Sequence, residues 1–236
     1  MQNKINIIFE NNDVVIIDKY AYIDVLTTLV ENIEKKCGSK IFPVTSLDYE
    51  ATGIVVFAKN EKAYKFISEQ FKKEQIKKIY YIIVNGIMEN VEGEINKNLL
   101  VTGDTTSVND KGIKSVTKYF VEEQFKNYAF VKVCPLTTRK NQIRAHFWSI
   151  GNTLATDKIY GSEEPILLSN LKRRYKGIKK EKPLLKRLPL HLYQMELVLP
   201  DKNEKISFTS NLPEDMSLTL KQLRKYNKSR GAAFIM

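Results

Sequence analysis

The sequence predicts an α+β fold with a mixed, largely antiparallel sheet and flanking helices. Segments with strand character outnumber those with helical spacing, and the two kinds do not alternate regularly as they would in a parallel α/β fold. The 236-residue chain also shows no internal repeat and no long linker. We therefore expect a single domain over residues 1–236, with residues 226–236 as a flexible tail.

The expected strands are short, rich in β-branched residues and bounded by turn residues. The first two are joined by a turn at residues 11–13. Residues 53–58 are apolar throughout, which predicts a strand buried on both faces. The strands are expected at residues 5–9, 14–17, 53–58, 79–84, 116–122, 129–133, 190–199 and 205–208.

Four segments carry apolar residues at helical spacing. Asp24 is a candidate N-cap for the first of them, and Gly38 follows its end as a natural stop. Gly151 ends the third in the same way. The helices are expected at residues 24–36, 60–73, 140–150 and 213–225. The inward side chains of the second helix are expected to be Ala63, Phe66, Ile67 and Phe71.

The composition argues against several classes of protein. Cys37 and Cys134 are too few for a disulfide framework, and His146 and His191 are too few for a zinc site. We read both histidines as structural. There is no phosphate loop or dinucleotide fingerprint, so no cofactor and no metal are expected. No apolar run approaches the roughly 18 residues of a membrane span, and the start lacks a signal peptide. We expect a cytoplasmic monomer.

The charge favours a polyanionic partner. The formal net charge is +11, and such an excess binds phosphates by releasing counterions. Residues 172–187, the basic segment, hold nine Lys or Arg against the single acid Glu181. We expect Arg173 and Arg174 there to contact phosphates; the alternative is a solvated loop. A second basic cluster lies at residues 221–230.

Asp48 is the candidate acid. It lies between the apolar segments 41–44 and 54–57, with Thr52 and Gly53 supplying a turn. An ionised carboxylate out of water is costly unless it is paired. The alternative is a turn-forming Asp that binds nearby backbone amides.

Arg144 is the candidate partner for that acid. It lies at the edge of the apolar face of its helix, beside Ile143 and Phe147. Burial raises the pKa of a carboxyl by roughly 3–5 units, and a neighbouring guanidinium lowers it by roughly 1–3 units. An acid enclosed by the fold therefore needs such a cation to remain an anion.

Tyr80 offers a flat aromatic face with a polar tip. Stacking on a nucleic-acid base stabilises a complex by about 1–3 kcal/mol. The alternative is an ordinary core tyrosine, because the chain has twelve Tyr. Strand alternation leaves open whether Tyr80 or Tyr81 faces inward.

Five segments, in order, resemble motifs of the RluA-type pseudouridine synthases. The family's His-Arg-Leu-Asp motif with its following Thr-(Ser/Thr)-Gly stands here as residues 45–53. Its Lys-x-Tyr segment matches residues 78–80, and its Gly-Arg-Thr-His-Gln-Ile-Arg-x-His helix matches residues 138–146. Its Gly-Asp-x-x-Tyr-Gly and Leu-His motifs match residues 156–161 and 190–191.

The resemblance implies a pseudouridine synthase catalytic fold and roles for three residues. Asp48 would be the catalytic aspartate, Tyr80 the aromatic under the target base, and Arg144 the salt-bridge partner of the aspartate. The reaction would isomerise uridine in structured rRNA or tRNA without a cofactor, after the nucleotide is flipped out. The basic segment would hold phosphates without reading sequence.

The chain departs from the family pattern at several positions. Ser46 replaces an arginine expected to fill the gap left by the flipped base. The family's Lys-Pro-x-Gly appears as residues 19–22, Lys-Tyr-Ala-Tyr, and Thr138 replaces a glycine. No N-terminal module of the S4 kind is expected, because the first strand pair begins at about residue 5. The departures leave two alternatives open: a non-catalytic RNA-binding protein on the same fold, and a hydrolase or lyase acting on nucleosides.

Overall fold

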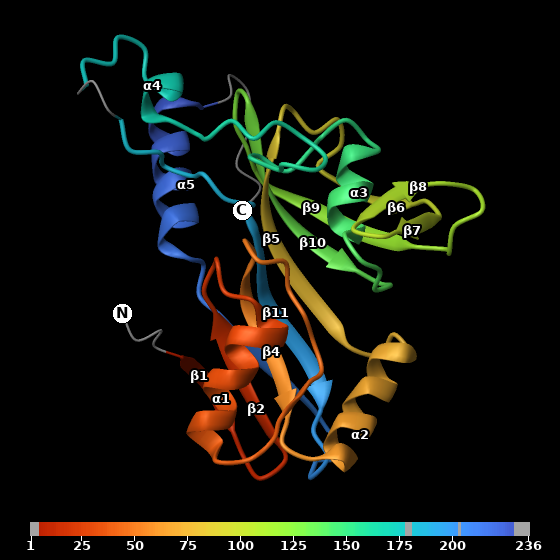
Figure 1. The fold of residues 1–236 in the computed structure, drawn as a ribbon. Coiled ribbons are helices and arrows are strands. Elements are labelled where there is room, and N and C mark those ends of the chain that lie inside the picture. Colours follow the sequence, from red (N-terminus) through yellow and green to blue (C-terminus); the bar gives the residue numbers. More distant parts are fainter. Residues whose placement is uncertain (1–4, 178–180, 203, 229–236) are drawn as a thin grey trace. The chain divides into compact units, whose positions relative to one another are not determined.

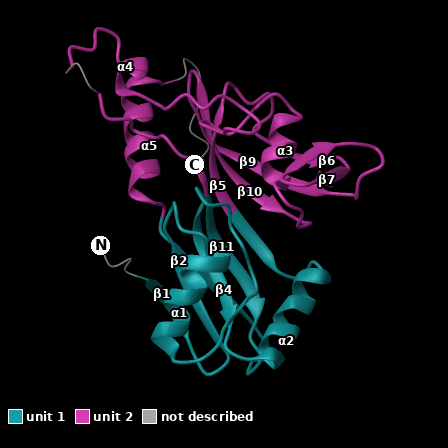
Figure 2. Ribbon diagram, in the orientation of Figure 1, with its two compact units in different colours: residues 1–79, 191–211 teal, residues 80–190, 212–236 magenta. Residues whose placement is uncertain are grey.

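The structure, a computed structural model, describes residues 5–177, 181–202 and 204–228 (Figure 1). They form two compact units (Figure 2). Unit 1 comprises residues 1–79 and 191–211, and unit 2 comprises residues 80–190 and 212–236. The chain passes from one unit to the other within β5 (Lys77–Asn85), at the start of β11 (Leu190–Val198) and between residues 211 and 212.

Unit 1 contains a sheet with the strand order β1-β2-β4-β11, in which β3 pairs with β4 and β12 with β11. These pairs are antiparallel except β4 and β11, which run parallel where Thr52 lies opposite His191. Its remaining strands and its helices are β1 (Asn6–Glu10), β2 (Val14–Lys19), β3 (Phe42–Pro43), β4 (Thr52–Ala58), β12 (Lys205–Thr209), the π-helical turn η1 (Val25–Leu29), α1 (Val30–Cys37) and α2 (Glu61–Lys72).

Local sequence explains most of unit 1. Asp24 accepts a hydrogen bond from the backbone N–H of Thr27 and so caps η1, as predicted. Gly38 ends α1 with φ 67°, a left-handed conformation that glycine adopts readily. Every residue of β4 is buried, which confirms the strand expected to be covered on both faces. In α2, however, Phe66 is exposed rather than inward, because the buried face follows Ala63, Ile67 and Gln70.

Gly53 allows β4 to approach β11 closely. Its φ is +114°, and a Cβ atom at this position would lie 2.3 Å from the carbonyl oxygen of Leu192. A backbone oxygen cannot yield like the end of a flexible side chain. The expectation that Thr52 and Gly53 supply a turn is therefore wrong: both belong to β4, the turn lies at residues 48–51, and Gly53 is required by the contact between the two strands.

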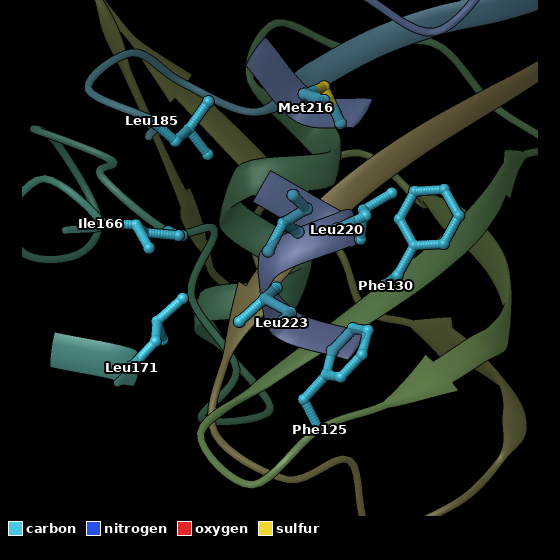
Figure 3. Close-up of a cluster of buried hydrophobic side chains, with 10 residues drawn as sticks. Phe125, Phe130, Ile166, Leu171, Leu185, Met216, Leu220 and Leu223 are labelled. Carbon is cyan, nitrogen blue, oxygen red and sulfur yellow. The ribbon is translucent and has the colours of Figure 1, made fainter. Parts of the chain in front are cut away.

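Unit 2 contains an antiparallel sheet with the strand order β5-β10-β9-β6 and a separate two-stranded sheet, β7-β8. α5 covers one face of the larger sheet, where Leu220 and Leu223 pack with Phe125 and Phe130 (Figure 3). The elements not yet given are β6 (Glu92–Asn96), β7 (Leu99–Thr102), β8 (Thr105–Val108), β9 (Val116–Gln124), β10 (Tyr128–Pro135), α3 (Gln142–Trp148), α4 (Leu168–Leu171) and α5 (Glu214–Tyr226).

The mixed, mostly antiparallel sheet with few helices confirms the predicted α+β class. Three strands in unit 2, β6, β7 and β8, were not predicted, because each of them is short and has only one buried residue. α3 begins at Gln142 rather than at residue 140, since Asn141 has φ 53° and cannot belong to a right-handed helix. In the expected tail, Asn227 is buried and Lys228 forms a β-bridge with Phe125; residues 229–236 lie outside the described residues.

Candidate active site

Asp48 lies in the loop between β3 and β4 of unit 1. The backbone N–H of Ala51 donates to its carbonyl oxygen at 2.9 Å, which closes a tight turn. The preceding Leu47 packs against a buried cluster of η1, α1 and β4. Asp48 is partly buried, so the full enclosure expected from sequence is not found: Ser46, two residues before it, and Tyr49, which follows it, are exposed.

The loop of Asp48 is held by a buried lysine. Lys19, at the end of β2, is only 1% exposed. Its Nζ donates to the carbonyl oxygens of Tyr20, Asp48, Tyr49 and Ala51 at 2.7–3.2 Å. An ammonium group removed from water needs such acceptors. Lys19 thus fixes the backbone of the acid-bearing turn, a role that the sequence did not predict.

Replacing Lys19 with Met should therefore loosen this turn. Methionine keeps most of the side-chain volume but cannot donate to the four carbonyl oxygens. We expect the free energy of unfolding to fall by about 2–4 kcal/mol, because hydrogen bonds to a charged group are lost and buried acceptors remain. Urea denaturation measures this change. The matched control is Lys65→Met on the exposed face of α2, which should change stability by less than about 0.5 kcal/mol; equal stability of the two variants would contradict the role of Lys19.

Arg144 lies on α3 of unit 2 and is buried together with an acid. Its Nε donates to Oδ2 of Asp157 at 2.8 Å and its Nη2 to Oδ1 at 2.7 Å, which is a bidentate ion pair. Nη1 donates to the side-chain oxygen of Asn141 at 3.2 Å. Asp157 is fully buried. A guanidinium has five N–H donors, so it can bind a second carboxylate in addition to Asp157.

Asp157 is the centre of a polar network. It lies in the motif at residues 156–161, but the sequence suggested no role for it. Its Oδ1 also accepts hydrogen bonds from the backbone N–H groups of Ile159 and Tyr160. The guanidinium of Arg144 lies 5.3 Å from the centroid of the Tyr160 ring, a cation–π distance. Thr156 has φ 57°, which explains why the matched family motif has glycine at this position.

The hairpin β7-β8 braces the same region (Figure 1). The hydroxyl of Tyr160 donates to the carbonyl oxygen of Thr106 and accepts from its N–H, both at 2.8 Å. The hydroxyl of Thr106 donates to the carbonyl oxygen of Lys140, and Asn141 donates to that of Asp104. The loop that leads into α3 is thus fixed from two directions. Asp48 belongs to unit 1 and Arg144 to unit 2, so the pairing of the two stays a prediction.

Tyr80 lies on the face of the unit 2 sheet that α3 covers. It is opposite Val133 of β10, which in turn is opposite Tyr119 of β9, and side chains of paired residues share a face. Phe147 of α3 packs edge-on against Tyr119. Tyr81 instead stacks on Phe130 in the cluster under α5. Tyr80 is therefore partly buried on the side that carries the helix of Arg144.

Arg173 and Arg174 are exposed after α4, and neither forms an ion pair with a residue that the structure describes. One member of the basic segment is not available to phosphate. Arg187 is 3% exposed and binds Asp215 through Nε and Nη2 at 2.6 and 2.7 Å. Such pairing cannot be predicted from the number of charges along the sequence. Lys179 and Lys180 lie outside the described residues.

A sequence profile described as RNA pseudouridylate synthase matches residues 23–149, more than half of the chain. The chain belongs to this family. The matched range contains Asp48, Tyr80 and Arg144. The members of the family are isomerases that act on uridine in RNA.

Three curated relatives illustrate the similarity. An uncharacterised RNA pseudouridine synthase of Chlorobaculum parvum is 28% identical over 93% of this chain and 74% of its own length. Ribosomal large subunit pseudouridine synthase D of Blochmanniella floridana is 27% identical over 94% of this chain and 74% of its own. The corresponding synthase C of Haemophilus influenzae is 28% identical over 77% of this chain. The match spans only 55% of that relative's length.

Two solved structures share the fold. Human RNA pseudouridylate synthase domain containing 4 aligns with a TM-score of 0.73 and 21% identity, over 93% of both chains. Human RNA pseudouridylate synthase domain containing 1 aligns with a TM-score of 0.67 and 18% identity, over 96% of this chain and 97% of that one. The pseudouridine synthase fold that the motifs implied is thereby confirmed.

The two histidines of this family member have buried hydrogen-bond partners. The Nε2–H of His146 donates to the carbonyl oxygen of Lys97, so Nδ1 accepts from the hydroxyl of Thr117. Burial lowers the pKa of His146, which favours the neutral ring. His191 similarly bridges Thr52 and the carbonyl oxygen of Ser210. The ring of His146 joins α3 to β9, and that of His191 joins β11 to β4, which supports the structural interpretation.

Within the described residues, no group of three or more His, Cys, Asp or Glu side chains lies close enough to hold a metal ion. No helix in the same residues is both long and apolar enough to cross a membrane.

Proposed function

We propose that this protein isomerises uridine to pseudouridine in RNA, with Asp48 as the catalytic aspartate. The observation that carries the proposal is the family match, which spans Asp48, Tyr80 and Arg144 in one continuous range. Asp48, Tyr80 and Arg144 also occupy the positions of the aspartate, the aromatic residue and the arginine in the family motifs. The rigid support of the Asp48 turn by Lys19 suits a group that must be held at a reacting atom.

The reaction needs one carboxylate and no other reagent. The bond between N1 of uracil and C1′ of ribose breaks, the base turns, and a bond forms between C5 and C1′. The proton on C5 is lost and N1 gains one, so product and substrate are isomers. A carboxylate beside C1′ suits chemistry at a sugar carbon. In the proposal, Arg144 keeps Asp48 ionised while its own position is fixed by Asp157.

We propose ribosomal RNA as the first substrate to test, and transfer RNA as the second. Two of the relatives described above are named as ribosomal large subunit synthases. The target uridine must leave its helix to expose C1′ and C5. Exposed cations such as Arg173 and Arg174 are suited to hold the phosphates that flank it.

Purified protein added to total RNA from a strain that lacks the gene tests the function. We expect new pseudouridine in ribosomal RNA, located by mass spectrometry of nuclease fragments. RNA from the parent strain should gain none at that position, because it is already modified. Binding without any pseudouridine would favour the non-catalytic RNA-binding alternative. Release of uracil would favour the nucleoside hydrolase.

Replacing Arg173 and Arg174 with Ala tests the basic segment. Each phosphate contact releases counterions on binding, so we expect the slope of log affinity against log salt to fall by about one unit per contact. Fluorescence anisotropy with labelled ribosomal RNA fragments over a salt series measures the slope. Lys62 and Lys65, exposed on α2, supply a control pair with the same loss of charge. An unchanged slope in the arginine variant would identify residues 173–174 as a solvated loop.

A further inference from the structure

Three exposed tyrosines of unit 1 lie in the turn of Asp48 or on the segment whose backbone is held to that turn. Tyr20, Tyr22 and Tyr49 are 51%, 43% and 56% exposed. Tyrosine combines a large apolar ring with one polar group, and such rings bury much of their surface when a partner is present. Three of them at one place leave an aromatic surface beside the candidate acid.

Backbone contacts join the three residues to Asp48. The carbonyl oxygens of Tyr20, Asp48 and Tyr49 all accept hydrogen bonds from Nζ of Lys19, at 3.1–3.2 Å. The N–H of Tyr22 donates to the carbonyl oxygen of Tyr49 at 2.7 Å. The rings of Tyr22 and Tyr49 lie 5.8 Å apart in an edge-to-face arrangement. The backbone that carries these tyrosines is thus held by Lys19, the same buried cation that holds the turn of Asp48.

Tyr22 occupies this place against its conformational preference. Its φ is 64°, in the left-handed region that is unfavourable for a bulky residue and readily adopted by glycine. The family motif that this segment resembles, Lys-Pro-x-Gly, has glycine at this position and proline at that of Tyr20. Ser46, in the same turn as Asp48, replaces a large arginine. The three exposed tyrosines therefore lie on the backbone that Lys19 holds together with that of Asp48, in a segment where Ser46 stands in place of the family's arginine.

We propose that Tyr20, Tyr22 and Tyr49 form a stacking platform for unpaired bases of the substrate RNA next to the target uridine. The proposal rests on the function proposed above. When a nucleotide is flipped out, its neighbours lose a stacking partner, and aromatic side chains replace that partner in many RNA complexes. Stacking accepts any base, which suits a chain with a net charge of +11 that holds phosphates by charge.

A binding measurement that needs no catalysis tests the platform. The probes are a fluorescein-labelled decauridylate and a decamer of the same length with abasic riboses, which has the same phosphates but no bases. Replacing all three tyrosines with Ala should weaken decauridylate binding by about tenfold or more. Binding of the abasic decamer and the salt slope should not change. The triple Phe variant should bind as the wild type, because the rings remain.

Two further variants test whether a loss of decauridylate affinity could result from a loss of folded structure instead of from the loss of the rings. Tyr22→Gly should lower decauridylate affinity while the melting temperature stays equal or rises, since glycine relieves the left-handed strain. Tyr64→Ala, which removes a 38% exposed tyrosine from α2 of the same unit, should leave affinity unchanged. Equal decauridylate affinity of the wild type, the triple Ala variant and the Gly variant would overturn the platform. An equal loss for both probes would overturn it as well.

The outcomes separate the platform from the proposed function. If the wild type forms pseudouridine and the tyrosine variants keep their affinity for decauridylate, the function stands and the platform is wrong. If the variants lose base-dependent binding and the wild type forms no pseudouridine, the platform stands on an RNA-binding protein.

Discussion

Replacing Asp48 with Asn is expected to reduce pseudouridine formation by about a thousandfold or more. The amide has the shape of the carboxylate but neither its charge nor its capacity to act as a base or nucleophile. Because Asp48 is partly exposed, the loss of charge should change the free energy of unfolding little. Single-turnover assays, with pseudouridine measured by mass spectrometry, give the rate, and anisotropy gives the affinity for RNA, which should change by less than about threefold.

Glu50→Gln is the matched control for this variant. Glu50 is a second carboxylate in the same turn, two residues from Asp48, and it is also partly buried. If Asp48 acts at the reacting atoms, only its own amide variant loses activity. An equal loss in both variants would indicate that the charge of the turn, rather than one carboxylate, is required. Full activity of Asp48→Asn would contradict the catalytic assignment directly.

The sequence predicted the elements whose pattern is local. The buried strand β4 was visible as an unbroken apolar run, and the cap of η1 by Asp24 was visible as a helix-start residue. The exposed hairpin β7-β8 has no such pattern, although it braces the loop before α3 through Thr106. Hydrophobic periodicity and composition indicate which segments are buried, but they do not indicate strands that lie at the surface.

The support of the candidate site depended on partners distant in sequence, which the sequence could not assign. Lys19 reads as a polar residue at the end of a strand, yet it is buried against carbonyl oxygens about 30 residues away. Asp157 stood inside a recognised motif but had no role until Arg144 was found beside it. Arg187 counted as an exposed cation until Asp215 was seen to bind it. The resemblance could have directed attention to both residues, because Asp157 lies in a segment that matches the family and Lys19 is the residue of the Lys-Pro-x-Gly pattern that this chain retains.

Replacing Asp157 with Asn is expected to lower the free energy of unfolding by about 3–5 kcal/mol. The variant removes the fully buried charge that binds the guanidinium of Arg144 through two hydrogen bonds, and breaking a buried ion pair by removing one partner costs about this much. The amide also cannot accept the two bonds from Arg144 as well as those from the N–H groups of Ile159 and Tyr160. Urea denaturation measures the loss, and the activity of the folded variant should fall as the position of Arg144 relaxes.

Asp215→Asn supplies a close control within unit 2. Asp215 binds the buried Arg187 in the same bidentate manner, but its own side chain is 37% exposed. Water can therefore solvate that site when the charge is lost, and we expect a loss of stability less than half that of Asp157→Asn. Equal losses would mean that burial of the acid does not determine the cost. A stable but inactive Asp157→Asn variant would indicate that Asp157 only fixes the position of Arg144 and contributes little to the stability of the fold.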